Sequence, residues 1–235
     1  MTSNIPILTL NNVSRTFGTF KAVTDVSETF GPDELNCIIG PNGAGKSTLL
    51  NMICGTLPVS SGSISFGETA IHGLSGDKIA RLGIARKFQV PSVFESLTVF
   101  ENFQVSAPAN SDLAILEEIL STVNLVEDLD VTASDLPHGK KQWLEIGMAL
   151  TMQPKVLLLD EPTAGLSADE TSATAKFLRG LVGKVTVVVI EHDMAFVREL
   201  GARTIVLHHG EVIASGPFSE IENNEFVRDV YLGRR

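Results

Sequence analysis

The chain of 235 residues predicts an α/β fold in which a helical segment interrupts a parallel sheet. Three short apolar runs support this prediction, because continuous apolar runs are typical of strands that are buried on both faces. The runs are Leu35–Ile39, Val156–Asp160 and Lys184–Ile190. Helical patterns follow each run, which is the order expected of parallel strands joined by helices.

The remaining elements of the core follow from local patterns. Ile7–Val13 and Val23–Phe30 are rich in β-forming residues and flank a turn at Phe17-Gly18. Helices are expected at Ser47–Cys54, Asp169–Val182 and Asp193–Leu200, and a hairpin is expected from Arg203–His208 and Glu211–Ser215 around His209-Gly210.

The character of the chain changes between about Val90 and Pro154, where helical patterns dominate. Apolar residues recur there at helical spacing in two sets: Leu113, Leu116, Leu120 and Val123, then Trp143, Ile146, Gly147 and Leu150. We therefore expect one domain, residues 1–235. Its α/β core would comprise residues 1–89 and 155–235, and a helical subdomain would span residues 90–154.

The composition excludes some classes of protein. Hydrophobic residues make up 43% of the chain, which is too many for a disordered protein, and the net charge of -10 disfavours nucleic acid as a partner. The longest apolar runs fall far short of the roughly 20 residues that a membrane helix requires. The N-terminus lacks the pattern of a signal peptide, so we expect a cytoplasmic chain with two reduced thiols, Cys37 and Cys54.

A phosphate-binding loop is the strongest functional signal. The segment is Gly40-Pro41-Asn42-Gly43-Ala44-Gly45-Lys46-Ser47, followed by Thr48. Its glycines let backbone N–H groups face a phosphate, and the helix that follows directs its positive end to the same place. Lys46 would bind the β- and γ-phosphates of ATP, and Ser47 would bind Mg²⁺.

Two acids end the buried strand Val156–Asp160 and extend this site. An aspartate at such a strand end, here Asp160, is expected to hold Mg²⁺ in a P-loop ATPase. Side chains alternate along a strand, so Glu161 projects differently and is predicted to be the general base for an attacking water.

Further segments follow in a characteristic order: Arg86-Lys87-Phe88-Gln89, Leu136-Pro137-His138-Gly139-Lys140, and His192 after a buried strand. Together with the loop and the two acids, they resemble the nucleotide-binding subunits of ATP-binding-cassette (ABC) transporters over essentially the whole chain. The resemblance implies a RecA-like ABC ATPase core with an antiparallel β subdomain and an inserted α-helical subdomain.

This resemblance also implies roles for single residues. Gln89 would contact Mg²⁺ and the membrane partner, His192 would contact the γ-phosphate, and Phe17 would stack on adenine. Leu136 to Lys140 would face the ATP held by a partner subunit. Here the sequence departs from the family pattern Leu-Ser-Gly-Gly-Gln, because Pro137 replaces the serine and Lys140 the glutamine.

Leu136 to Lys140 form the signature loop. The departures in it predict that the ATP site completed by this loop binds nucleotide but hydrolyses it poorly. Loss of a hydrogen bond to a charged group costs about 1.5–3 kcal/mol, although Lys140 could restore some attraction. In addition, Ser167 stands where the family has an aspartate. Two unequal sites would fit a heterodimer with a second ATP-binding subunit.

A narrower resemblance links the chain to the importers of branched-chain amino acids and amides. Trp143–Met148 and the ending Val230–Arg234 are most similar to the ATP-binding subunits of urea importers. This implies a peripheral subunit on the cytoplasmic face of the inner membrane, two permease subunits and an exported solute-binding protein. The apolar cluster Phe94, Phe100 and Phe103 would suit either permease docking or a plain core role.

Three other interpretations remain beside uptake of urea. The same role in a branched-chain amino acid or other amide importer is the first. A soluble ABC ATPase for cofactor assembly or nucleic-acid maintenance is the second, although the acidic charge disfavours nucleic acid. The third, a P-loop kinase or GTPase, is disfavoured by the ordered set Gln89, Gly139, Glu161 and His192.

Overall fold

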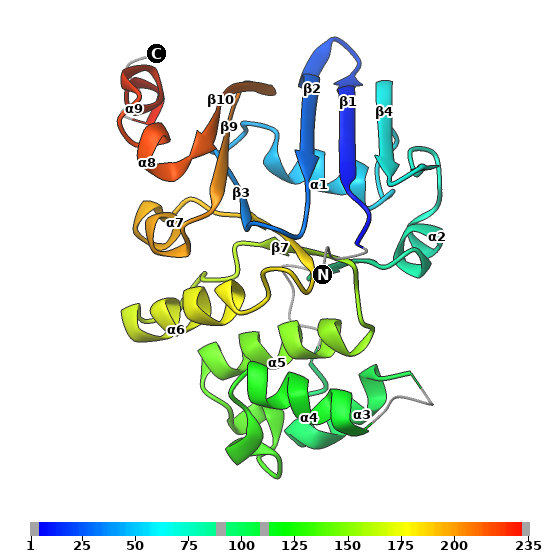
Figure 1. The fold of residues 1–235 in the computed structure, drawn as a ribbon, viewed down its shortest axis with the longest axis vertical. Coiled ribbons are helices and arrows are strands. Elements are labelled where there is room, and N and C mark those ends of the chain that lie inside the picture. Colours follow the sequence, from blue (N-terminus) through cyan, green and yellow to red (C-terminus); the bar gives the residue numbers. More distant parts are fainter. Residues whose placement is uncertain (1–4, 88–92, 109–112, 232–235) are drawn as a thin grey trace.

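The computed structural model describes residues 5–87, 93–108 and 113–231, and it contains two sheets and a helical part (Figure 1). The first sheet is antiparallel, with the strand order β2-β1-β4-β5. Its strands are β1 (Leu8–Phe17), β2 (Phe20–Phe30), β4 (Ser61–Phe66) and β5 (Thr69–Ala70). The expected N-terminal strands therefore form a separate antiparallel layer.

The second sheet has the strand order β10-β9-β3-β8-β7-β6. Its strands are β3 (Asn36–Ile39), β6 (Ile84–Lys87), β7 (Val156–Asp160), β8 (Thr186–Ile190), β9 (Arg203–His208) and β10 (Glu211–Pro217). All neighbours are parallel except β9 and β10, which form the expected hairpin. This sheet brings the carboxyl ends of β3, β7 and β8 to one edge, where the predicted site residues follow.

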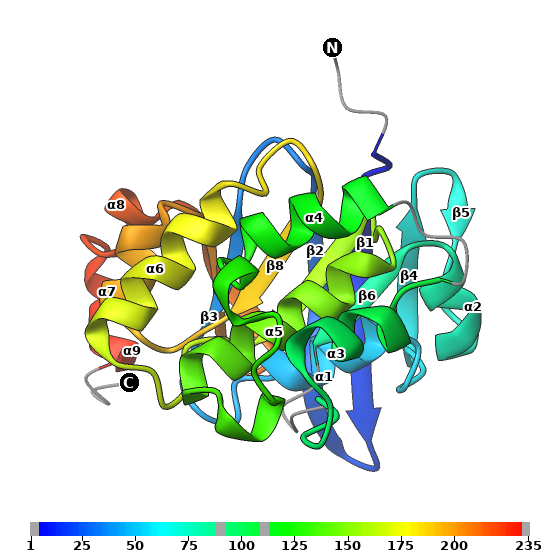
Figure 2. The same ribbon diagram turned by 90° about the horizontal axis from the view of Figure 1, so that it is seen from below.

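The helices cover the parallel sheet and build a separate part at one end of the molecule. They are α1 (Lys46–Ile53), α2 (Gly76–Arg81), α3 (Val99–Ser106), α4 (Leu113–Thr122), α5 (His138–Thr151), α6 (Ala168–Arg179), α7 (Met194–Leu200), α8 (Phe218–Ile221) and α9 (Glu225–Tyr231). Two 3₁₀ turns, η1 (Val126–Asp128) and η2 (Ala133–Asp135), precede α5. Helices α3, α4 and α5 lie together at the lower end in Figure 1, and Figure 2, which views the molecule from below, shows them in front of the strands.

Successive residues of the central strands point alternately into two buried cores. Leu157, Leu159 and Val187 pack with the helices α5, α6 and α7, whereas Leu158 and Val188 pack with α1 and the antiparallel sheet. A strand that buries both faces must be apolar at every position, which explains the continuous apolar runs. The α/β fold expected from the sequence, with an antiparallel β part and an inserted helical part, is confirmed.

Both cysteines are free thiols, but they are buried to different degrees. Cys37 in β3 is fully buried, and Cys54 after α1 is half-buried. Burial raises the pKa of the Cys54 thiol to about 11, against a smaller opposing effect of the nearby Arg86. Burial and, to a lesser extent, the nearby Glu191 raise the pKa of Cys37 well above the usual thiol range.

Within residues 5–87, 93–108 and 113–231, every helix is too short or too polar to cross a lipid bilayer.

Candidate nucleotide site

The glycine-rich loop joins β3 to α1, as the sequence predicts, and its glycines are required by close backbone contacts. Gly45 has φ +104°, and a Cβ at this position would lie 2.5 Å from the carbonyl oxygen of Ala22. A Cβ on Gly40 would lie 2.2 Å from the carbonyl oxygen of Leu207. Neither position can accept a side chain, so β2 and β9 fix the path of the loop.

Lys46 begins α1 and is folded back over the loop. Its ammonium donates to the carbonyl oxygens of Gly40, at 2.7 Å, and Pro41, at 3.2 Å. Burial lowers the pKa of Lys46, while the carboxylates of Glu161 and Asp160 act in the opposite direction. The cation is thus held at the loop and near both acids.

A cavity of about 390 Å³ opens beside this loop and contains several of the predicted residues. It is lined by Phe20, Ala22, Asn42, Gly43, Ala44, Gly45, Lys46, Ser47, Thr48, Glu161 and Ile190. The N-terminus of α1 faces this space, so the partial positive charge of the helix favours an anion there. Loop, lysine, hydroxyls and carboxylate therefore surround one phosphate-sized space.

Asp160 and Glu161 differ sharply in environment although they are neighbours. Asp160 is buried, and its Oδ2 lies 3.0 Å from a guanidinium nitrogen of Arg86 in β6. The same guanidinium donates to Oδ1 of Asn51 in α1 at 2.5 Å. Glu161 instead lines the cavity, with a backbone φ of +47° that is unusual for a residue other than glycine.

His192 reaches the same edge of the sheet from β8. Its Nδ1 lies 3.4 Å from Oε1 of Glu161, and its side chain is 62% exposed. This contact follows from the parallel pairing of β7 with β8, in which Asp160 is opposite Ile190. Glu161, the predicted base, and His192, the histidine predicted to contact the γ-phosphate (the switch histidine), are therefore adjacent.

Phe17 and Phe20 lie on either side of the turn that joins β1 and β2. Phe17 is 45% exposed, and the Arg15 guanidinium lies 4.6 Å from the centre of its ring. Of the two, Phe20 lines the cavity in the described structure, and Phe17 does not. The Arg15 guanidinium over the Phe17 ring gives an exposed cationic and aromatic surface at this turn.

The signature loop lies apart from this cavity, since none of Leu136 to Lys140 is among the described residues that line it. It instead contacts the segment after Glu161. His138 Nε2 and Gln142 Nε2 both lie 3.1 Å from the carbonyl oxygen of Ala164. A Cβ on Gly139 would lie 2.3 Å from Oε1 of Glu170, so a larger residue here would displace the Glu170 carboxylate.

The three departures from the family pattern have local explanations. Pro137 is the N-cap of α5, a position at which proline leaves the helix intact. Lys140 binds both carboxylate oxygens of Asp128 at 2.7 and 2.6 Å, so its charge is already paired within the chain. Ser167 caps α6 through a reciprocal pair of hydrogen bonds with Glu170.

Three further residues bear on the site: the predicted Gln89, and Arg86 and Glu191, whose contacts the sequence did not reveal. Gln89 lies outside the described residues. Arg86 pairs with Asp160, and the buried carboxylate of Glu191 accepts hydrogen bonds from Thr163 and His192. A sequence signal exists for Glu191, because a charged residue directly follows the apolar strand β8, whereas Arg86 lies beside Lys87 in β6 and does not stand out.

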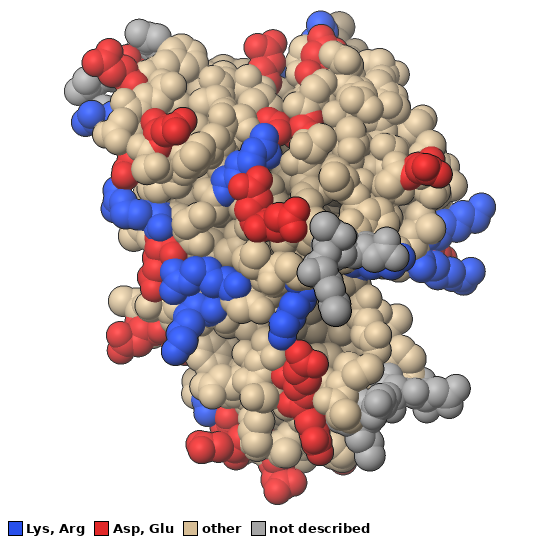
Figure 3. Space-filling model, in the orientation of Figure 1, with Lys and Arg blue, Asp and Glu red and all other residues tan. Residues whose placement is uncertain are grey.

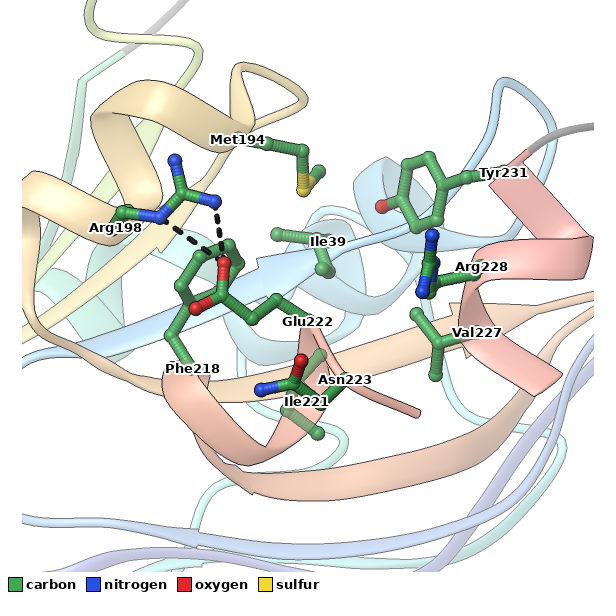
Figure 4. A pocket seen from close by; sticks show the side chains of 10 residues that line it. All are labelled: Ile39, Met194, Arg198, Phe218, Ile221, Glu222, Asn223, Val227, Arg228 and Tyr231. Atoms are coloured by element: carbon green, nitrogen blue, oxygen red, sulfur yellow. Dashed lines mark hydrogen bonds and ion pairs between the residues drawn. The ribbon is translucent and has the colours of Figure 1, made fainter. Parts of the chain in front are cut away.

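A separate cavity of about 400 Å³ lies between β3 and the C-terminal helices (Figure 4). Apolar side chains from Ile39, Met194 and Phe218 line it, and the ion pair of Arg198 and Glu222 lies beside them. It contains none of the predicted phosphate-binding side chains among the described residues. The nucleotide site is therefore assigned to the cavity at the loop.

Comparison with known proteins supports this assignment. The model of the ABC transporter family matches residues 23–164. The chain is 34% identical to the high-affinity branched-chain amino acid transport ATP-binding protein LivG of Salmonella typhimurium, over 97% of this chain and 98% of that protein. It is 33% identical to the corresponding protein BraF of Pseudomonas aeruginosa, with the same coverage.

Solved structures agree with these matches. The ADP conformation of MJ1267, an ATP-binding cassette of an ABC transporter, superimposes with a TM-score of 0.86 and is 29% identical in sequence. The match covers 98% of this chain and all of that one. From the loop, the two acids and these matches, we conclude that the chain belongs to the ABC transporter family, as an ATP-binding subunit that hydrolyses ATP to power transport.

Proposed function

We propose that this subunit powers an importer of branched-chain amino acids, from the cytoplasmic face of the inner membrane. One observation carries the proposal: relatives named for this transport match nearly the full length of both chains at 33–34% identity. They favour the branched-chain alternative over the urea importer suggested by Trp143–Met148 and the C-terminal segment. Residues 232–235 of that segment lie outside the described structure.

The site fits MgATP in its chemistry. Lys46 and the N-terminus of α1 offer positive charge to the phosphates, and the backbone at Gly43 and Gly45 is open to them. Ser47 and Asp160 supply the oxygen ligands that Mg²⁺ prefers, with Gln89 as a further proposed ligand outside the described residues. When bound, Mg²⁺ would neutralise charge that develops on the transferred phosphoryl group.

The two polar residues that follow β7 and β8, Glu161 and His192, then have different roles in the chemistry. Glu161 accepts the proton of the attacking water, and the alternation between Asp160 and Glu161 directs its carboxylate into the cavity. His192, within 3.4 Å of Glu161, stabilises the charge on the γ-phosphate. Phe17, with Arg15 over its ring, is the proposed stacking surface for adenine.

We also propose a second, different ATP-binding subunit as partner. Among the described residues that line its own cavity there is none from the signature loop, which would serve ATP held by that partner. Lys140 cannot readily replace the missing contact of the family's serine, because Asp128 already binds its ammonium. The site completed by this loop is therefore the weaker of the two.

Two permease subunits and an exported solute-binding protein complete the proposed transporter. Of the apolar cluster after residue 92, Phe103 is fully buried in the core, whereas Phe94 and Phe100 are 48% and 38% exposed. The exposed pair supports docking to a permease, and the buried one has the plain core role. Acidic and basic side chains lie interspersed over the face in Figure 3, which does not favour nucleic acid as a partner.

Uptake of labelled leucine and labelled urea tests the proposal in cells that lack this gene. We expect leucine uptake to be lost, to return with the normal gene, and not to return with Glu161→Gln. Glu211→Gln, the same chemical change at an exposed position in β10, is the matched control and should restore uptake fully. Loss of urea uptake alone would instead support the urea importer, and loss of neither would refute both substrates.

A further inference from the structure

The end of β8 carries a buried acid that the mechanism above does not use. Glu191 follows Ile190 and is only 1% exposed, although a buried carboxylate is costly unless its oxygens accept hydrogen bonds. In the parallel pairing of β7 with β8, Asp160 is opposite Ile190, so Glu191 lies beside the chain that leaves β7 through Glu161. A buried carboxylate therefore lies beside the turn that carries the predicted base.

Both oxygens of this carboxylate have partners from the site itself. Oε1 accepts from the hydroxyl of Thr163 at 2.5 Å and from its backbone N–H at 3.2 Å. Oε2 accepts from the backbone N–H of His192 at 3.1 Å. Hydrogen bonds to a carboxylate are among the stronger ones in proteins, so Glu191 fastens the turn after Glu161 to the switch histidine.

The backbone of Glu191 adds a third connection. Its N–H donates to the carbonyl oxygen of Ile38 at 3.2 Å, in the strand β3 that leads into the phosphate-binding loop. One residue is thus bonded to all three segments that surround the phosphate space: β3 before the loop, the turn after Glu161, and His192.

The turn that Glu191 holds contains a strained residue. The φ of +47° at Glu161 costs about 1–3 kcal/mol for a side chain other than glycine, and such a conformation persists only where the surroundings enforce it. Upstream, the N–H of Glu161 donates to Ile190 O at 2.9 Å. Downstream, Thr163 is the first residue that is anchored by a buried side chain, and its anchor is Glu191.

We propose that Glu191 is a positioning residue for ATP hydrolysis, which holds Glu161 and His192 in register through Thr163. Because its side chain does not line the nucleotide cavity, its loss should disturb the geometry of water attack and leave ATP binding nearly intact. Displacements of about 1 Å in an active site can lower the rate by 10²-fold. The proposal rests on ATP hydrolysis alone and does not depend on the transported solute.

The test measures the kcat and KM of MgATP hydrolysis by the full chain. Glu191→Gln keeps the shape but sets an amide N–H₂ against one of the N–H donors, and Thr163→Val removes the hydroxyl without changing the volume. We expect each variant to lower kcat by about 10- to 100-fold and to change KM by less than about threefold. Thr163→Ser, which keeps the hydroxyl, should stay within about threefold of the normal kcat.

The double variant that combines Glu191→Gln with Thr163→Val distinguishes a positioning role from general destabilisation of the fold. If Glu191 acts through Thr163, the double variant should be no slower than the slower single one, because both changes break the same link. Thr204→Val is the matched control, since Thr204 is fully buried in β9 and its hydroxyl donates to the carbonyl oxygen of Ala202, outside the nucleotide site. It should leave kcat unchanged.

Three results would overturn the proposal: a normal kcat in Glu191→Gln, a rise in KM without a fall in kcat, or additive losses in the double variant. If Glu191→Gln melts below the assay temperature, the comparison of Thr163→Val with Thr163→Ser decides instead. Equal activity of those two variants would then refute the role of the link.

Discussion

Removal of Arg86 from its ion pair with Asp160 should destabilise the protein far more than removal of one partner from a surface pair of the same length. Its nitrogen–oxygen distance is 3.0 Å and its side chains are 11% and 2% exposed. Lys184 and Glu118 are 2.9 Å apart, but their side chains are 57% and 66% exposed. The two pairs therefore differ in burial and hardly at all in distance.

Replacement of Arg86 by methionine would leave a carboxylate buried without its cation. Removing one partner of a buried pair typically costs about 3–5 kcal/mol, whereas an exposed pair contributes about 0.2–1 kcal/mol. We expect Arg86→Met to lower the free energy of unfolding by at least about 3 kcal/mol, which includes the lost bond to Asn51. Lys184→Met should lower it by less than about 1 kcal/mol.

Urea unfolding of the purified full chain, followed by circular dichroism, measures both changes. The double variant Arg86→Met with Asp160→Asn should be more stable than Arg86→Met alone, because asparagine carries no charge that needs a partner. The reasoning is refuted if Arg86→Met and Lys184→Met lose equal stability, or if Asp160→Asn does not relieve the loss in the double variant.

Three further predictions concern the cap, the helical part and the chemistry. Hydrogen bonds from Ser167 lower the pKa of Glu170, so their contribution to the free energy of unfolding is present at neutral pH and is lost as the pH falls below about 4.5. Ser167→Ala should therefore lower the free energy of unfolding, measured in urea, by about 1 kcal/mol at pH 7 and by less at pH 3. A Cβ on Gly147 would lie 2.5 Å from the ring of Phe103, so Gly147→Ala should lower stability by about 1–3 kcal/mol, and Phe103→Leu should partly rescue it in thermal melts. Glu161→Gln should reduce phosphate release by at least about 100-fold while ATP binding, measured by calorimetry, changes little.

Much of the fold was accessible from the sequence because its central strands bury both faces. The range Val156–Asp160 matches β7, and the hairpin around His209-Gly210 is present as β9 and β10. Strand β4, which lies between β1 and the two-residue strand β5, was not predicted, because Ser61–Phe66 is rich in serine and partly exposed. A strand of an antiparallel sheet that buries only one face lacks the continuous apolar run that identifies the central strands of the parallel sheet.

The predicted site residues could be found because each occupies a fixed place relative to a strand end. The contacts of Arg86 and Glu191 could not, because they join strands that are far apart in sequence and adjacent only in the folded sheet. The pairing of Lys140 with Asp128 was missed for a related reason: it depends on how η1 packs beside α5. A charged side chain carries no sequence signal of the partner that the fold brings to it.

The burial of the two thiols has a practical consequence for following motion in this chain. A thiol reacts with maleimides as the thiolate, and the raised pKa values of Cys37 and Cys54 keep both protonated at pH 7. A single cysteine introduced at the exposed Ser134, just before the signature loop, would therefore take a fluorophore selectively in the otherwise unaltered protein. Because neither Cys37 nor Cys54 would take up the label, distances between the helical part and the nucleotide site can be measured without replacing the natural cysteines.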